Sequence, residues 1–229
     1  MASASQTNPD DFLIRFEGQF DGGFYKITRE GSSAILSVTL IDNGSIMVKP
    51  DILVARSGNI AFKRAFRFKL RKLLNDDPFF EYFCVGKGEI LLAPSIWGDI
   101  VPIHLDGDTK WTVGRNGHLA MTYGIVKETM SHPICREIMM NEPVFVYRFS
   151  GPGVVFIPSL GAVQQRTLNK GEKWFVNLAA LVAWNCYYEM KGDEQDLSIV
   201  CCFEGPGTVI TQAQNHNALP SWIIRRGEN

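Results

Sequence analysis

The chain has 229 residues, of which 45% are hydrophobic and 21% are charged, so it can bury a core and wholesale disorder is excluded. Its formal net charge of −1 excludes a general electrostatic attraction to nucleic acid or to an anionic membrane. A chain of this length forms one large all-β domain or two smaller domains.

The N-terminal stretch has none of the features of a common targeting signal. It lacks the basic and apolar regions of a secretory signal peptide, and acidic residues precede the first arginine, Arg15, unlike in a mitochondrial presequence. No apolar run approaches the roughly 18 residues of a membrane-spanning helix. We therefore expect residues 1–19 and 226–229 to be flexible tails of a soluble, intracellular chain without a transmembrane segment.

A pattern of leucine, glycine, valine and alanine recurs three times along the chain. The three copies are LIDNGSIMVKPDILVA from Leu40, LDGDTKWTVGRNGHLA from Leu105 and LNKGEKWFVNLAALVA from Leu168. Further along the chain, each copy is followed by an acidic or proline-containing turn, an apolar run and a pair of glycines. We expect three like units within one triplicated domain. The predicted units are 24–95, 98–159 and 161–212, and the predicted domain is 20–225.

The apolar runs in these units alternate as β-strands do. Phe145, Tyr147 and Phe149 alternate with Val146 and Arg148, and turn residues recur about every 8–12 positions. Such spacing is typical of a β-sandwich or barrel. Because each unit is too small to bury its own apolar face, we expect an all-β, β-sandwich-like single domain with a pseudo-threefold repeat.

The glycine pairs invite comparison with phosphate-binding loops, but the residues around them argue against that reading. Pro152 and Pro206 have no N–H to offer a phosphate, and β-branched residues follow instead of a helix. We predict that the glycines are structural and allow tight corners between strands. The six turn glycines are Gly86, Gly88, Gly151, Gly153, Gly205 and Gly207.

One segment departs from the strand pattern. In AFKRAFRFKLRKLLND, residues 61–76, Phe62, Phe66 and Leu70 fall on one helical face, which predicts a short basic helix or loop near 61–74. Its basic face is the candidate surface for an acidic partner, RNA or anionic lipid headgroups, and the alternative is a solvated face above core aromatics. The basic residues are Lys63, Arg64, Arg67, Lys69, Arg71 and Lys72.

Residues capable of catalysis or metal binding lack the spacing that such sites need. The five cysteines form no CxxC pair, and we expect them to be reduced and mostly buried. None of His104, His118, His132 and His216 stands in a metal-binding motif. Cys135 lies three residues from His132, but the pair is more typical of a small apolar residue beside a turn. We therefore predict no enzymatic activity, no metal site and no cofactor.

Three stretches resemble a known family, namely GDIVPIHLDGD at 98–108, GPGVVFIPSLGAV at 151–163 and FEGPGTVITQAQNHNALPSW at 203–222. They are similar to the altered-inheritance-of-mitochondria protein twenty-four family, also called mitochondrial biogenesis proteins. Members of this family end in a Gly-x-Gly strand followed by an Asn and a Ser-Trp. In this chain those residues are Asn215, Ser221 and Trp222.

The resemblance implies a fold like that of the tryptophan RNA-binding attenuator protein, a double-stranded β-helix, and assembly into homo-oligomers, trimers or higher. It also implies a mitochondrial location with protein partners at the inner membrane. The cytoplasm is the alternative location, because the N-terminal stretch lacks a clear mitochondrial presequence. The function we expect is that of a non-enzymatic scaffold or adaptor. Two alternatives stay open. One is an RNA or anionic-lipid binding module using residues 61–72, and the other is a small-molecule binder or enzyme with a deep pocket in the β-helix interior.

Overall fold

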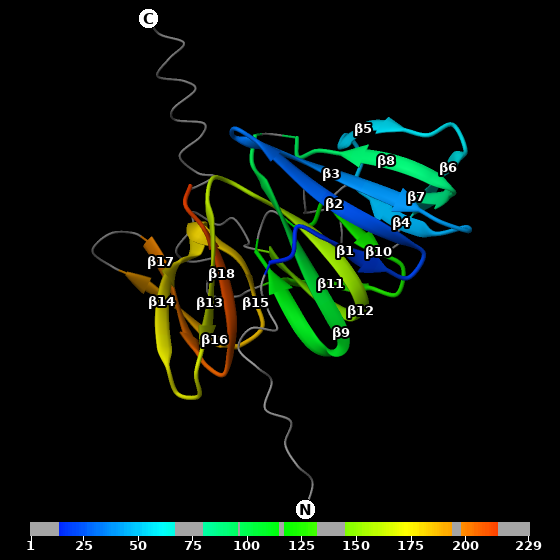
Figure 1. Cartoon of the computed structure of the whole chain (residues 1–229). Coiled ribbons are helices and arrows are strands. Elements are labelled where there is room, and N and C mark those ends of the chain that lie inside the picture. Colours follow the sequence, from blue (N-terminus) through cyan, green and yellow to red (C-terminus); the bar gives the residue numbers. More distant parts are fainter. Residues whose placement is uncertain are drawn as a thin grey trace, which may run out of the picture.

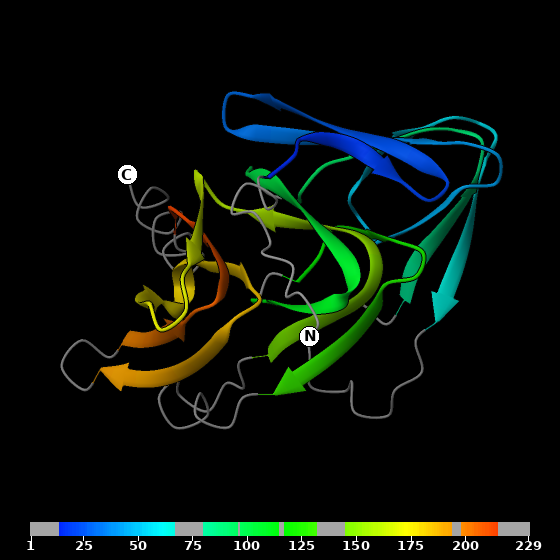
Figure 2. The same ribbon diagram turned by 60° about the horizontal axis from the view of Figure 1, so that its bottom comes forward.

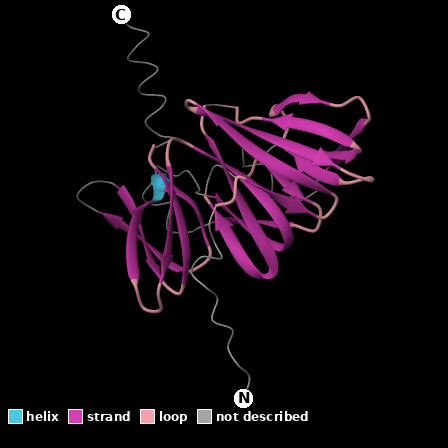
Figure 3. Ribbon diagram, in the orientation of Figure 1, coloured by secondary structure: helices cyan, strands magenta, loops and turns pink. Residues whose placement is uncertain are grey.

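The secondary structure of the protein is almost entirely β-strand, which confirms the all-β prediction. The computed structural model describes residues 14–66, 80–95, 97–114, 117–131, 145–193 and 198–214. Within these ranges the strands form three antiparallel sheets, and the one helical element is a 3-10 turn, η3 (Leu178–Ala180) (Figures 1 and 3). The predicted pseudo-threefold repeat and double-stranded β-helix stay predictions.

The first sheet is built from the N-terminal part of the chain and has the order β1-β2-β3-β8-β5. In β2 and β3 every second residue is buried, including Tyr25, Leu36 and Val38, as expected for a sheet with one solvated face. The strands are β1 (Glu17–Phe20), β2 (Gly23–Glu30), β3 (Ser33–Leu40), β5 (Leu53–Arg56) and β8 (Gly88–Leu92).

The predicted N-terminal tail, residues 1–19, includes the first residues of a strand. We expected residues 1–19 to be flexible, but β1 begins at Glu17 and pairs with β2 from Glu17↔Lys26 to Phe20↔Gly23. The reason is a tight turn at Gly22, which has a φ of 93° and lets the chain fold back within two residues. Residues 1–13 lie outside the described ranges.

The second sheet is the largest and has the order β13-β18-β15-β9-β12-β10-β4-β7-β6, with β11 also paired to β12. Its centre is the long pair β9 and β12, drawn in green between the blue strands and the yellow to red strands in Figure 2. The strands are β4 (Ser45–Val48), β6 (Ile60–Phe66), β7 (Phe80–Gly86), β9 (Asp99–Val113), β10 (Ala120–Thr122), β11 (Val126–Ser131), β12 (Phe145–Ser159), β13 (Val163–Leu168), β15 (Leu181–Trp184) and β18 (Gly207–Gln212).

The third sheet is small and has the order β14-β17-β16. Its strands are β14 (Lys173–Asn177), β16 (Tyr187–Asp193) and β17 (Ser198–Glu204). The inner face packs onto a core cluster that contains Trp184, Phe203 and Met190. There are two further core clusters. One lies under the first sheet, around Leu36 and Phe156, and the other lies along the β9–β12 pair, around Phe149.

The turn glycines lie where the chain changes its pairing partners. Gly86 ends β7 in the second sheet and Gly88 begins β8 in the first, while Gly205 and Gly207 separate β17 from β18 in the same way. Gly151 and Gly153 lie inside β12, at a register shift in its ladder with β9. Five of the six have φ between 89° and 151°, a backbone conformation that is energetically costly for any residue with a side chain. The five are Gly86, Gly88, Gly151, Gly153 and Gly207.

The helix or loop predicted near 61–74 is wrong for residues 61–66, which form a strand. Residues 61–66 belong to β6, at the edge of the second sheet, and pair with β7 from Ala61↔Val85 to Phe66↔Phe80. Phe62 packs on Tyr82 with ring centroids 5.4 Å apart, so cross-strand aromatic contact outweighs the helical spacing of the apolar residues. Residues 67–74 lie outside the described ranges.

The cysteines that the structure describes are free thiols, as we expected. Cys84, Cys201 and Cys202 are buried, and Cys186 is half-buried. Cys135 lies outside the described ranges. The buried three act as small apolar residues within their strands.

Replacing Gly153 with alanine should strongly destabilise the protein. Gly153 has a φ of 144°, and an added Cβ would lie 2.2 Å from Oγ1 of Thr122, which accepts a hydrogen bond from the Val154 amide. Strain and overpacking together should lower the free energy of unfolding by about 3 kcal/mol or more, measured by urea denaturation.

Gly58→Ala is the matched control for this variant. An added Cβ there meets no atom within 4 Å, and its φ is not in the positive region. Its effect should stay within about 0.5 kcal/mol. Equal stabilities of the two variants would show that the corner at Gly153 does not need glycine.

Candidate functional site

A cavity of about 220 Å³ lies where β4, β10 and β12 end side by side. The three strands are held in register there, since Lys49 N donates to Leu119 O at 3.0 Å and Leu119 N donates to Phe156 O at 2.7 Å. The cavity is lined by Lys49, Ile52, Pro94, Ser95, Trp97, His118, Leu119, Pro158, Ser159 and Leu160.

The lining residues come from four loops or strand ends that are far apart in the sequence. The β4–β5 connection is tied to the segment after β8, because Ala93 N donates to Ile52 O at 2.9 Å. The end of β12 is tied to β18, because Leu160 N donates to Oε1 of Gln212 at 2.9 Å, and Gln212 is itself buried. The cavity is therefore lined by the first two predicted units and the residues that directly follow them, and the third unit contributes only Gln212, which holds the end of β12.

The cavity has a polar floor and a more exposed rim. His118 and Ser159 are 1% and 2% exposed, whereas the Trp97 side chain is 43% exposed. The other walls are mainly apolar, from Ile52, Leu119, Pro158 and Leu160. A few polar groups in a largely apolar hollow are the usual composition of a ligand site.

His118 lies against the buried carboxylate of Glu81, which comes from β7. Nε2 of His118 is 3.2 Å from Oε1 of Glu81, and both side chains are almost fully buried. The pKa of His118 is lowered to about 4, chiefly by burial and in part by the charges of Lys127 and Lys49, while Glu81 opposes this shift. His118 is therefore a neutral imidazole at pH 7.

Three buried polar atoms of the lining residues lack hydrogen-bond partners among the described residues. They are Nδ1 and Nε2 of His118 and Oγ of Ser159. An unsatisfied polar atom in a protein interior costs about 1–3 kcal/mol, so native structures contain few of them. The described residues therefore do not offset the cost of burying these polar atoms beside the cavity.

Charges of both signs lie near His118. Lys127 is 7% exposed and its ammonium lies 4.2 Å from the centre of the Tyr147 ring. Lys127 and Lys49 act on the pKa of His118 as positive charges, and Glu81 acts as a negative charge.

The predicted basic surface is described only in part. Lys63 and Arg64 lie on β6 with exposed side chains. Arg67, Lys69, Arg71 and Lys72 lie outside the described ranges. The structure therefore places two of the six predicted residues on an exposed sheet edge.

His104 makes a structural contact between the first two sheets. Its Nε2 is 2.7 Å from the hydroxyl of Tyr25, which itself donates to the Arg15 carbonyl at 2.9 Å. Burial raises the pKa of Tyr25 to about 12, and burial followed by the charge of Arg15 lowers the pKa of His104. The pair is neutral at pH 7, with His104 as the donor to the phenol oxygen.

The remaining sequence candidates lie outside the described ranges. They are His132, Cys135, Asn215, His216, Ser221 and Trp222. Among the residues that are described, no three His, Cys, Asp or Glu side chains are grouped so as to hold a metal ion. In the same part of the chain, no helix has the length and apolar character needed to span a bilayer.

Sequence reasoning missed the cavity because its residues share no local motif. His118 was considered only for metal-binding spacing, although its position just before the buried strand β10 is unusual for a polar ring. No sequence motif surrounds Lys49, Glu81 or Ser159, since each stands alone among turn or strand residues. Only the pairing of β4, β10 and β12 brings their segments together.

The fold and the cavity define a single-domain, antiparallel β protein with a small pocket at the junction of its strands. The family model described as mitochondrial biogenesis AIM24 matches residues 25–214, and the chain belongs to this family. This confirms the family inferred from the sequence.

The fold is shared with solved structures. The crystal structure of protein SPYM3_0169 from Streptococcus pyogenes matches with a TM-score of 0.72 and 21% identity, covering 88% of this chain and 98% of that one. At this identity the likeness concerns the fold alone. No curated protein matches the chain.

The buried state of His118 predicts a specific loss of stability in acid. Its pKa lies below the unfolded value of 6.5, so below pH 6.5 the unfolded chain takes up a proton that the native chain does not. The contribution to the free energy of unfolding is therefore complete above pH 6.5 and falls by roughly 3 kcal/mol down to about pH 4.

Comparison with His118→Gln isolates this effect. The wild type should lose more stability than the variant between pH 6.5 and 4, measured by urea denaturation at a series of pH values. Above pH 7 the stability difference between the two proteins should be constant. A difference that stays constant over the whole range would contradict the assignment of a neutral, buried His118.

Proposed function

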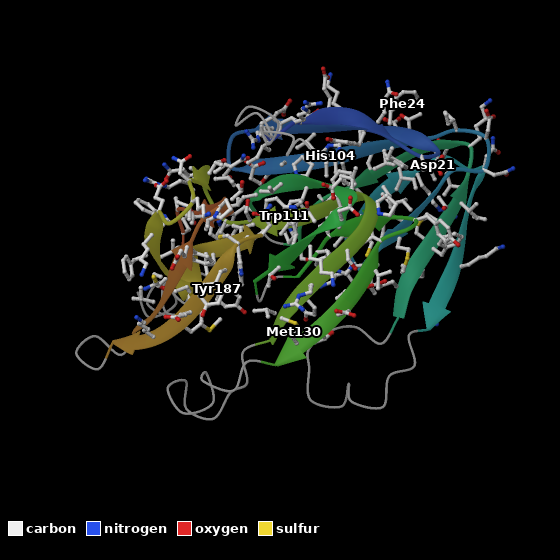
Figure 4. The ribbon with its side chains drawn as sticks, turned by 90° about the horizontal axis from the view of Figure 1, so that it is seen from below. Asp21, Phe24, His104, Trp111, Met130 and Tyr187 are labelled. Carbon is white, nitrogen blue, oxygen red and sulfur yellow. The ribbon has the colours of Figure 1, made fainter. Side chains whose placement is uncertain are left out.

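We propose that the protein is a non-enzymatic scaffold of the mitochondrial biogenesis family that assembles with copies of itself through the outer face of its third sheet. The observation that carries this proposal is the exposure of two aromatic side chains there. Phe175 on β14 is 62% exposed and Tyr187 on β16 is 64% exposed. Figure 4 shows Tyr187 on this side of the molecule, apart from Phe24 on the first sheet.

The register of the third sheet places both aromatics on one face. Phe175 lies opposite Cys202, and Tyr187 lies opposite Glu204, two residues further along the central strand. Because side chains two residues apart share a face, Phe175 and Tyr187 flank β17 on its outer side. The opposite face carries Phe203 and Met190, which are buried in the core.

Charged residues surround these aromatics on the same face. Lys173 lies 3.8 Å from the carboxylate of Glu204, and the Tyr187 hydroxyl donates to Glu189 at 3.0 Å. Aromatic side chains within a polar rim are the usual composition of a protein contact surface. The composition of this face therefore favours a contact with another protein surface over permanent exposure to solvent.

The shifted pKa values of the buried side chains support a binding role over nucleophilic catalysis. Burial raises the pKa of Cys84 to about 12 and that of Cys186 to about 11, so neither forms the reactive thiolate at pH 7. His118, with a pKa of about 4, is a weak general base.

A mitochondrial site of action, with protein partners at the inner membrane, is proposed from the family alone. The alternative of an RNA or anionic-lipid binding module depends on the basic residues of 61–72, of which the structure describes Lys63 and Arg64 as exposed. That alternative requires binding that weakens steeply with salt. Flat affinity between low and moderate salt would remove it.

The assembly can be tested by the mass of the protein in solution. The wild type should have the mass of a trimer or a larger oligomer, measured by light scattering after size exclusion. The double variant Phe175→Ser/Tyr187→Ser should shift toward the monomer, because it removes the two exposed aromatic contacts.

Tyr123→Ser is the matched control for this experiment. Tyr123 is 73% exposed and lies just after β10, on another sheet. Its replacement should leave the mass unchanged. A monomeric wild type, or equal masses for the wild type and the double variant, would overturn the proposed assembly.

A further inference from the structure

We propose that Asn43 is a deamidation site that the folded protein keeps unreactive, and that local opening of the chain around it allows an irreversible conversion. Asn43 is exposed, and Gly44, which follows it, is buried. The two residues belong to the β3–β4 corner, residues 41–44, which joins the first sheet to the second. Glycine after asparagine leaves the reaction least hindered, because no Cβ blocks the approach of the glycine nitrogen.

The reaction is a cyclisation followed by hydrolysis. The backbone nitrogen of Gly44, after loss of its proton, forms a bond to Cγ of Asn43, and the side-chain amide leaves as ammonia. Water then opens the resulting succinimide ring. Cleavage of the new bond to Cγ gives an aspartate, and cleavage of the original peptide bond gives an isoaspartate. One water is consumed and one ammonia is released, so the reaction requires no oxidant and no cofactor.

Hydrogen bonds hold the reacting nitrogen in the closed corner. Gly44 N donates to Ile41 O at 2.6 Å, and Gly86 N donates to Gly44 O at 3.2 Å. The succinimide nitrogen carries no hydrogen, so the ring cannot keep the bond to Ile41. A buried, hydrogen-bonded amide also loses its proton to solvent only when the structure opens locally. The closed corner therefore withholds the nucleophile.

Tight backbone packing keeps the corner from rearranging while it is closed. Asp42 and Asn43 have φ values of 42° and 68°, as in a type I′ turn. A Cβ added to Gly44 would collide with the carbonyl oxygen of Gly22, and Ile41 N donates to the same oxygen at 3.0 Å. Gly44 therefore cannot swing toward the Asn43 side chain without displacing Gly22.

The two products differ in whether they fit this corner. An aspartate at position 43 keeps the backbone path and is tolerated at positive φ, as the neighbouring Asp42 is. An isoaspartate directs the main chain through the former side chain and adds one carbon between Ile41 and Gly44. This extra length is incompatible with the 2.6 Å hydrogen bond that closes the turn and with the packing of Gly44 on Gly22. The isoaspartate therefore leaves a permanent covalent record that the corner has opened.

The first test compares the folded protein with a synthetic peptide of residues 36–50, which has the same bond but no corner. Peptide mass mapping after incubation at neutral pH follows Asn43 and separates it from the other Asn–Gly pair, at 116–117. We expect Asn43 to convert about tenfold or more slowly in the folded protein, because only the open fraction reacts. Conversion at the rate of the peptide would overturn the proposal.

Gly22→Ala tests the corner without altering the Asn43–Gly44 bond. Gly22 has a φ of 93°, and an added Cβ would lie 2.8 Å from Cα of Gly44, so the variant should open more often and convert Asn43 about fivefold faster or more. Gly31→Ala is the matched control, because Gly31 also has a positive φ, 59°, but an added Cβ meets no atom within 4 Å. It should convert Asn43 at the wild-type rate. Equal rates in the wild type and a folded Gly22→Ala variant would contradict the role of the corner.

The wild type alone gives a second measurement, which is decisive even if Gly22→Ala fails to fold. Hydrogen exchange of the Gly44 amide reports how often the corner opens. As urea is raised below the unfolding transition, this exchange and the deamidation of Asn43 should accelerate together. Faster exchange with unchanged deamidation would refute the link between opening and reaction.

The fate of the two products tests the consequence. After incubation in urea and dilution, chains with isoaspartate at position 43 should collect in the fraction that does not refold, whereas Asn43→Asp should refold like the wild type. Equal recovery of the isoaspartate chains would show that the corner tolerates the longer main chain. The inference is independent of the proposed assembly, because Phe175 and Tyr187 lie on the third sheet and the β3–β4 corner does not.

Discussion

The antiparallel ladder between β9 and β12 is the interaction on which the rest of the structure depends. Its register runs from Tyr147↔Val113 to Ser159↔Asp99. β15 pairs with β9 on one side and β10 pairs with β12 on the other, and β10 in turn carries β4. In the second sheet, as far as the described residues show it, strands from the beginning and the end of the chain are thus joined through this ladder.

The ladder also determines where the cavity lies. β12 ends at Ser159, and its last residues stand next to β10 and β4, so Ser159, His118 and Lys49 come together at one end of three neighbouring strands. At the same end Asp99 accepts a hydrogen bond from Nε of Arg29 at 2.8 Å, which ties the first sheet to β9. Strand ends supply side chains from rigid backbone, which is the arrangement that a selective site requires.

Burial sets the protonation state beside the cavity. The same loss of hydration that makes His118 neutral at pH 7 also makes its ring nitrogens and the Ser159 hydroxyl, which lack partners among the described residues, costly to bury. The exposed aromatics of the third sheet, Phe175 and Tyr187, lie on strands that contribute nothing to the cavity lining. The proposed assembly face is therefore formed by strands other than those that line the cavity.

The sequence by itself determined the all-β class and the family, because strand alternation and repeated turn residues are local features that a reader can follow over a few positions. Gly151 and Gly153 were visible in this way, as were the buried cysteines. The tertiary structure alone decided the rest. Residues 61–66 form a strand because Phe62 packs on Tyr82 of the neighbouring strand β7. The helical spacing of Phe62 and Phe66 could not reveal that contact. The site of His118, Glu81 and Ser159 exists only through strand pairing between distant segments, since hydrogen-bond register, which no local pattern encodes, places these side chains together.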